Sequence, residues 1–145
     1  MKKLLFGLLL CLALVSCNDD NDKPQPAEML VGSWEAVACE AMSMVGESVV
    51  SISSWNAGDP EGGVYLMSDW FVINRDGSGK GRDGKLTWIL SGEVFRIMYG
   101  TSNNGFGYIK DLDVLELSSD TLVLEVSATS YHGYVDYEKV TFSRK

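Results

Sequence analysis

Residues 85–99, KLTWILSGEVFRIMY, place apolar side chains at every second position on both sides of a Ser-Gly pair. A period of two is typical of β-strands, because successive side chains point to opposite faces of the sheet. The Ser-Gly pair predicts a tight turn between two such strands. The side chains expected to face the core are Leu86, Trp88, Leu90, Phe95, Ile97 and Tyr99.

The same pattern continues on both sides of this hairpin, from about residue 30 to the end of the chain. Glycine is frequent (15 residues) and proline rare (3), and no stretch keeps a helical period over ten positions. Inward positions on the last two strands are Leu122, Leu124, Val126, Val140 and Phe142. The expected strands cover residues 33–40, 47–53, 64–74, 79–90, 94–99, 107–117, 121–127 and 133–144.

Short connections between these strands predict an all-β fold with antiparallel neighbours in chain order. Eight such strands are expected to close into an up-and-down barrel, because closure removes exposed edges. The length of 145 residues fits one domain, and the net charge of −8 argues against a nucleic-acid partner.

The N-terminus has the pattern of an export signal. Lys2 and Lys3 precede twelve apolar residues (4–15), too few to span a bilayer as a helix. The run ends at Leu14-Val15-Ser16-Cys17, which resembles the lipobox of bacterial lipoproteins. The resemblance implies cleavage after residue 16 and a membrane anchor of acyl chains, such as palmitate, on Cys17. Residues 17–29 are then an acidic tether, and residues 30–145 the folded domain.

The composition of the tether gives an indication of where the protein is located. Acidic residues just after the lipidated cysteine resemble the export signal of outer-membrane lipoproteins, although a merely solubilising tether explains them equally well. We expect a lipid-anchored protein of the outer membrane, facing the periplasm or the cell surface.

Cysteine usage argues against a disulfide or a metal site. Cys11 lies in the signal and Cys17 carries the anchor, so the folded domain retains only Cys39. His132 is the one histidine, whereas a structural zinc site needs about four ligands. A Cys39–His132 catalytic pair is conceivable, but Cys39 lies in a strand pattern and is expected to be a buried thiol.

Two further stretches carry a family resemblance. Leu30-Val31-Gly32-Ser33-Trp34 resembles the Gly-x-Trp motif at the start of lipocalins. The stretch 73–79, Trp88 and the strand at 122–124 resemble small lipocalin-like domains of bacterial lipoproteins. The resemblance covers residues 30–145. It implies that Trp34 plugs one end of the barrel and that Arg144 stacks on it, both in structural roles.

The leading functional hypothesis is binding of a small apolar ligand inside the barrel. Ala36 and Ala38 are expected to share the face of Trp34, which leaves space inside the barrel, and residues 41–63 are expected to form a long loop over its mouth. Small or flexible apolar residues suit such a pocket. The candidate ligand-binding residues are Met42, Met44, Trp55, Trp70, Phe71, Trp88 and Phe95.

The alternative is a filled barrel that binds a surface protein or a glycan through its loops. Aromatic residues in 103–108 and 131–134 could form such a patch, since tyrosine is frequent in interface hot spots. Catalysis is not expected, because the single histidine has no nucleophile motif around it. No cofactor or metal is expected either.

Overall fold

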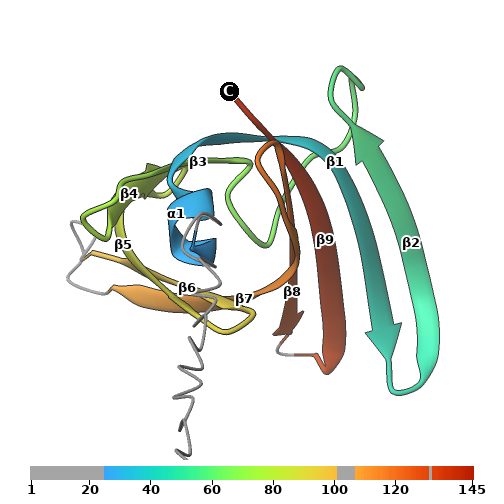
Figure 1. Ribbon diagram of the computed structural model, residues 1–145. Coiled ribbons are helices and arrows are strands. Elements are labelled where there is room, and N and C mark those ends of the chain that lie inside the picture. The colour runs from blue at the N-terminus through green and yellow to red at the C-terminus, as the bar shows by residue number, and fades with distance from the viewer. Residues whose placement is uncertain (1–24, 101–106, 131) are drawn as a thin grey trace, which may run out of the picture.

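The computed structural model describes residues 25–100, 107–130 and 132–145, and the predicted signal peptide and Cys17 lie outside this part of the chain. The described residues form nine antiparallel strands and one short helix, joined by turns and loops (Figure 1). Their bounds are α1 Pro26–Leu30, β1 Gly32–Val45, β2 Ser48–Asn56, β3 Trp70–Ile73, β4 Ser78–Gly81, β5 Gly84–Ser91, β6 Val94–Tyr99, β7 Tyr108–Leu117, β8 Thr121–Thr129 and β9 Tyr134–Arg144.

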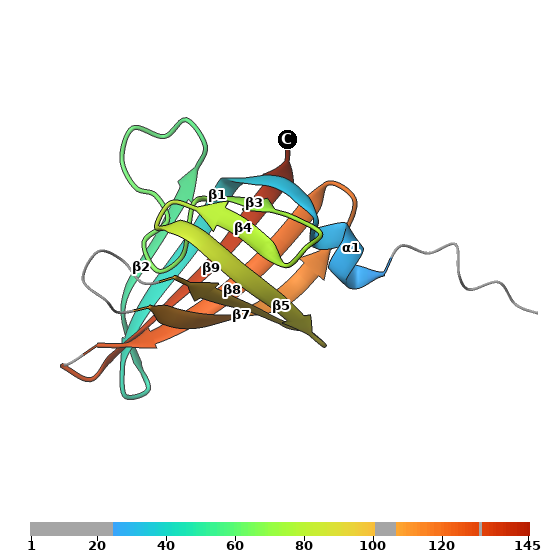
Figure 2. The same ribbon diagram turned by 90° about the vertical axis from the view of Figure 1, so that its left-hand side faces the viewer.

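Eight of these strands form a closed barrel, which confirms the predicted fold. Each strand from β3 to β9 pairs with the next, and β1 closes the ring by pairing with β3 on one edge and β9 on the other. The extra strand, β2, pairs with the second half of β1 and lies outside the ring. Figure 1 looks into the barrel and shows α1 over its opening. The same helix lies at one end of the barrel in Figure 2.

A bulge in β1 changes which side chains face inward. Ala36 pairs with Phe142 and Ala38 with Thr141, so Val37 is an extra residue in the ladder. An extra residue shifts the alternation by one position. Ala36 and Cys39 are therefore buried, and the expectation that Ala38 shares the face of Trp34 is wrong.

Three predicted segments are also wrong in part. Residues 79–90 are two strands, because Arg82 and Asp83 form a two-residue turn before Gly84, whose φ is +120°. Residues 41–56 are not a loop but the end of β1 and the strand β2. The strand expected at 64–74 begins only at Trp70.

Large side chains from different walls meet in the centre of the barrel. The ring centroid of Phe71 on β3 lies 6.1 Å from that of Phe95 on β6 and 5.5 Å from that of Phe142 on β9. Trp88 on β5 lies 6.1 Å from Phe95. These contacts between rings on separate strands occupy the centre of the barrel. The predicted inward residues of β5, β6, β8 and β9 are buried, apart from the half-buried Leu90.

One end of the barrel is closed by Trp34, which is 1% exposed. Its indole Nε1 donates a hydrogen bond of 2.8 Å to the carbonyl oxygen of Leu30 in α1. Cζ of Arg144 lies 4.3 Å from the centroid of the Trp34 ring, and its guanidinium donates to the carbonyl oxygens of Val31, Met29 and Ser119. Gly32 has a φ of +145°, which other residues rarely adopt, and an added Cβ would also meet the guanidinium of Arg144, so this position favours glycine.

The other end is crossed by residues 64–68, which we call the strap. The strap has no regular structure, and side chains bind its backbone instead. The carboxylate of Glu138 accepts hydrogen bonds from the backbone N–H groups of Tyr65 (2.5 Å) and Leu66 (2.7 Å). Arg82 donates to the carbonyl oxygens of Val64 and Met67, at 2.8 Å each. These contacts hold Val64 and Met67 against the core.

Cys39, the one cysteine among the described residues, is buried, as predicted. Cys39 is 3% exposed and is a free thiol. Burial, together with the negative charges of Glu138 and Glu40, raises the pKa of the Cys39 thiol to about 11. A thiol that stays protonated at neutral pH is a poor nucleophile.

Candidate binding site on the outer wall of the barrel

The seven residues proposed from the sequence to bind a ligand do not gather at one place. Phe71, Trp88 and Phe95 lie together in the core, where they contact one another. Trp70 is half-buried at the start of β3, and Nζ of Lys80 lies 6.0 Å from the centroid of its ring.

The other three predicted residues lie on the β1–β2 hairpin. Trp55 packs against the edge of the core, with its ring close to Gly62. Met42 and Met44 are half-buried on β1. Met42 lines a groove of about 230 Å³ that also includes Ser43, Asp136 and Glu138. None of the seven lines the larger hollow described next.

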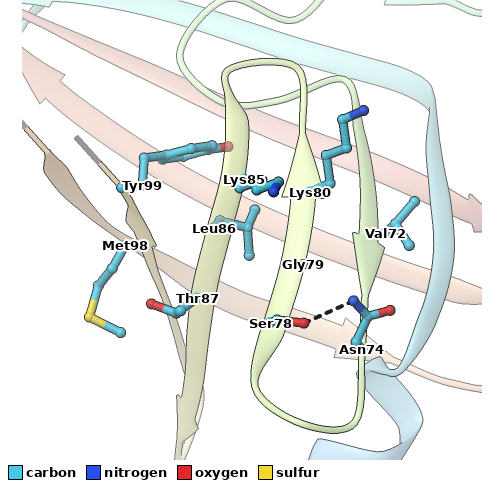
Figure 3. A pocket seen from close by; sticks show the side chains of 11 residues that line it. Val72, Asn74, Ser78, Gly79, Lys80, Lys85, Leu86, Thr87, Met98 and Tyr99 are labelled. Carbon is cyan, nitrogen blue, oxygen red and sulfur yellow. Dashed lines mark hydrogen bonds between the residues drawn. The ribbon is translucent and has the colours of Figure 1, made fainter. Parts of the chain in front are cut away.

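An open hollow of about 830 Å³ lies on the outer wall of the barrel, over β3, β4, β5 and β6 (Figure 3). It is lined by Val72, Asn74, Ser78, Gly79, Lys80, Lys85, Leu86, Thr87, Met98, Tyr99 and Gly100. The hollow therefore combines apolar surface with hydroxyl, amide and ammonium groups.

The register of the sheet places most of these side chains in two rows that cross the strands. Val72 pairs with Lys80, and Lys80 pairs with Lys85, which forms the first row. Directly opposite residues of antiparallel strands point to the same face. Because Phe71, Ile73 and Leu86 are buried in the core, this row faces outward.

The second row runs through Ser78, Thr87 and Met98, which are also paired across the strands. Asn74 extends it, since its Nδ2 donates to Oγ of Ser78 at 3.0 Å, as the dashed line in Figure 3 shows. The polar groups of this row lie just after β3 and on β4 and β5, whereas Met98 on β6 supplies a flexible apolar side chain.

The two lysines give the hollow a positive charge. Like charges directly opposite one another destabilise a sheet, and within the described residues no carboxylate lies at salt-bridge distance from Lys80 or Lys85. Other basic side chains differ in this respect: Arg96 is paired with Asp111 at 2.6 Å and Lys139 with Glu40 at 3.1 Å. Although the chain has a net charge of −8, Lys80 and Lys85 form a local positive patch that attracts anions.

The loop aromatics proposed for partner binding are only partly described. Phe106 and Tyr131 lie outside the described residues. Tyr108 is partly exposed, stacks on Tyr99 at 4.6 Å and donates a hydrogen bond to Oδ2 of Asp83. Burial and this hydrogen bond raise the pKa of Tyr108. Binding of a protein or a glycan by these loops stays a prediction.

No group of three or more His, Cys, Asp or Glu side chains in the described ranges could hold a metal ion. No helix in those ranges is long and apolar enough to cross a membrane.

Comparison with protein-family models, curated proteins and solved structures finds no match. The eight-stranded antiparallel closed barrel is compatible with a lipocalin-like fold, and no family match confirms the resemblance.

Proposed function

We propose that the protein is a membrane-tethered binding module that holds an amphipathic, negatively charged ligand in the hollow over β3–β6. The observation that carries the proposal is the placement of Lys80 and Lys85 directly opposite each other, with no carboxylate partner among the described residues, at the edge of apolar surface. An anionic group between the two ammonium groups would relieve their repulsion.

The filled centre of the barrel favours this outer wall over the lumen. A ligand in the lumen would have to displace rings that contact each other from β3, β5, β6 and β9. Removing such contacts costs several kcal/mol, because protein interiors are close-packed. On the outer wall, Val72 and Met98 offer apolar surface without any displacement.

The proposal can be tested by titrating the protein with dodecanoate below its critical micelle concentration. Replacing both lysines (Lys80→Gln and Lys85→Gln) should weaken binding about tenfold, since each partly exposed charge interaction contributes up to about 1 kcal/mol. Isothermal titration calorimetry measures the change. Uncharged dodecanol should bind the wild type and the double variant with equal affinity.

Lys139→Gln is the matched control, because this lysine lies on the outer face of β9 and is paired with Glu40. It should leave dodecanoate binding unchanged. Equal affinity of the wild type and the double variant for dodecanoate would contradict the proposed site.

The membrane tether is the second part of the proposal and rests on the lipobox-like sequence ending at Cys17. Cys17→Ala should move the protein from the membrane fraction to the soluble fraction of cells that express it. Cys11→Ala, in the signal itself, should leave it in the membrane fraction. Fractionation followed by immunoblotting gives the answer, and a Cys17→Ala variant that still sediments with membranes would exclude this anchor.

A further inference from the structure

The strand β2 has one edge without a strand partner. Residues 38–45 of β1 pair with one edge of β2, and in the described part of the chain no other strand pairs with it. Figure 1 shows β2 at the outer margin of the sheet, beyond β1. All of its nine residues are exposed except the half-buried Trp55. At the end of the strand, the backbone N–H of Asn56 donates to Oδ2 of Asp59 at 2.8 Å, and the backbone N–H of Asp59 donates to the carbonyl oxygen of Asn56 at 3.0 Å. The outer backbone groups of residues 48–54 have no strand partner and are open to another strand.

The strand β2 itself lacks the residues that usually prevent an edge strand from pairing with another chain. Proteins commonly protect such edges with charged residues or proline, and the sequence of β2, SVVSISSWN, contains neither. Its apolar side chains are exposed instead, with Ile52 at 75% the most exposed. A bulge interrupts the pairing with β1 at Val50, near the hairpin turn, and leaves residues 51–56 regular.

We propose that β2 is the dimerisation edge of this protein, and that its partner is β2 of a second copy. Two identical strands that pair antiparallel about a two-fold axis form a self-complementary interface. If the axis passes through Ile52, each Ile52 faces its counterpart, and Ser51 faces Ser53 of the second copy.

Because β2 carries no charged residue, two copies can approach along this strand without direct repulsion between like charges. The chain carries a net charge of −8, so contact between most of its faces is opposed by repulsion. In the pairing about Ile52, no charged residue of β2 meets another, because the strand has none. Glu47, just before the strand, would lie opposite the uncharged Ala57.

The outer face of the sheet would extend the contact. A second groove of about 230 Å³, beside Ile52, is lined by Met42 and Tyr137 and also by Glu40, Glu125 and Lys139. The two Ile52 side chains would contact the apolar part of this groove. One strand pair is a small interface, below the usual 1,200–2,000 Å². The dimer should therefore be reversible and should depend on protein concentration. This inference does not depend on the proposed ligand or on the anchor.

Cysteine cross-linking of the full chain in cells tests the proposal. Ile52→Cys should give a dimer band with a short bis-maleimide reagent, because the two side chains are expected to lie directly opposite each other. The substitution at so exposed a position should not disturb the fold. The native Cys39 is buried and should not react.

Ile109→Cys is the matched control, since Ile109 is an exposed β-branched residue (65%) on β7, within the barrel rather than at an edge. We expect the dimer band of Ile52→Cys to be at least fivefold stronger. No dimer band, bands of equal strength in the two variants, or a product whose mass shows a different protein would each overturn the proposal.

Discussion

Replacing Trp34 with alanine should lower the free energy of unfolding by about 3–5 kcal/mol. The side chain is 1% exposed, and its loss would leave a cavity at the closed end of the barrel. The carbonyl oxygen of Leu30 would lose its hydrogen bond from the indole, and Arg144 would lose the ring on which it stacks. Urea unfolding followed by tyrosine and tryptophan fluorescence measures the change.

Trp34→Phe is the control for this first prediction. It keeps an aromatic ring beneath Arg144 but removes the N–H donor, so it should cost clearly less than the alanine substitution. An unchanged unfolding midpoint for Trp34→Ala would show that the tryptophan does not plug the barrel.

Replacing Glu138 with alanine should cost about 3 kcal/mol and release the strap. The side chain is 2% exposed, and its carboxylate accepts two backbone hydrogen bonds from Tyr65 and Leu66. Hydrogen bonds to a charged group contribute about 1.5–3 kcal/mol, and the two N–H groups would lose their partner. Amide hydrogen exchange at Tyr65 and Leu66 should therefore become much faster than in the wild type.

Glu116→Gln provides the comparison, because Glu116 is exposed on β7. It should change stability by less than about 0.5 kcal/mol. Slow exchange at Tyr65 and Leu66 in the Glu138→Ala variant would mean that the strap is held by Arg82 and the core contacts alone.

The architecture was predictable because alternation is a local property of the sequence. Leu86, Trp88, Phe95 and Ile97 are buried as their positions in the pattern require. The bulge at Val37 was not predictable, since one extra residue in a ladder leaves no mark in a run of small apolar residues. The apolar residues of the strap run directly into β3, so the sequence predicts one strand over 64–74. Val64 and Met67 are instead held against the core by Glu138 and Arg82, which are distant in sequence and leave no mark in the local pattern.

The candidate site was missed for a related reason. With residues 79–90 read as one strand, Lys80 and Lys85 fall on opposite faces. The turn at Arg82 and Asp83 makes them direct neighbours instead. The spacing Lys-Gly-Arg-Asp-Gly-Lys, with a glycine on each side of the turn, was the available signal. The aromatic residues predicted to bind a ligand show the converse error. A core side chain and a ligand-binding side chain have the same apolar pattern, so the sequence does not distinguish them.

The most direct test of binding on the outer wall is a map of the perturbed residues by NMR. Two-dimensional ¹H–¹⁵N and methyl spectra would be recorded during titration with dodecanoate. The account predicts shifts at Val72, Lys80, Lys85 and Met98, with the signals of Phe71, Phe95 and Phe142 unchanged. Shifts confined to the three phenylalanines would place the ligand in the lumen and would contradict it.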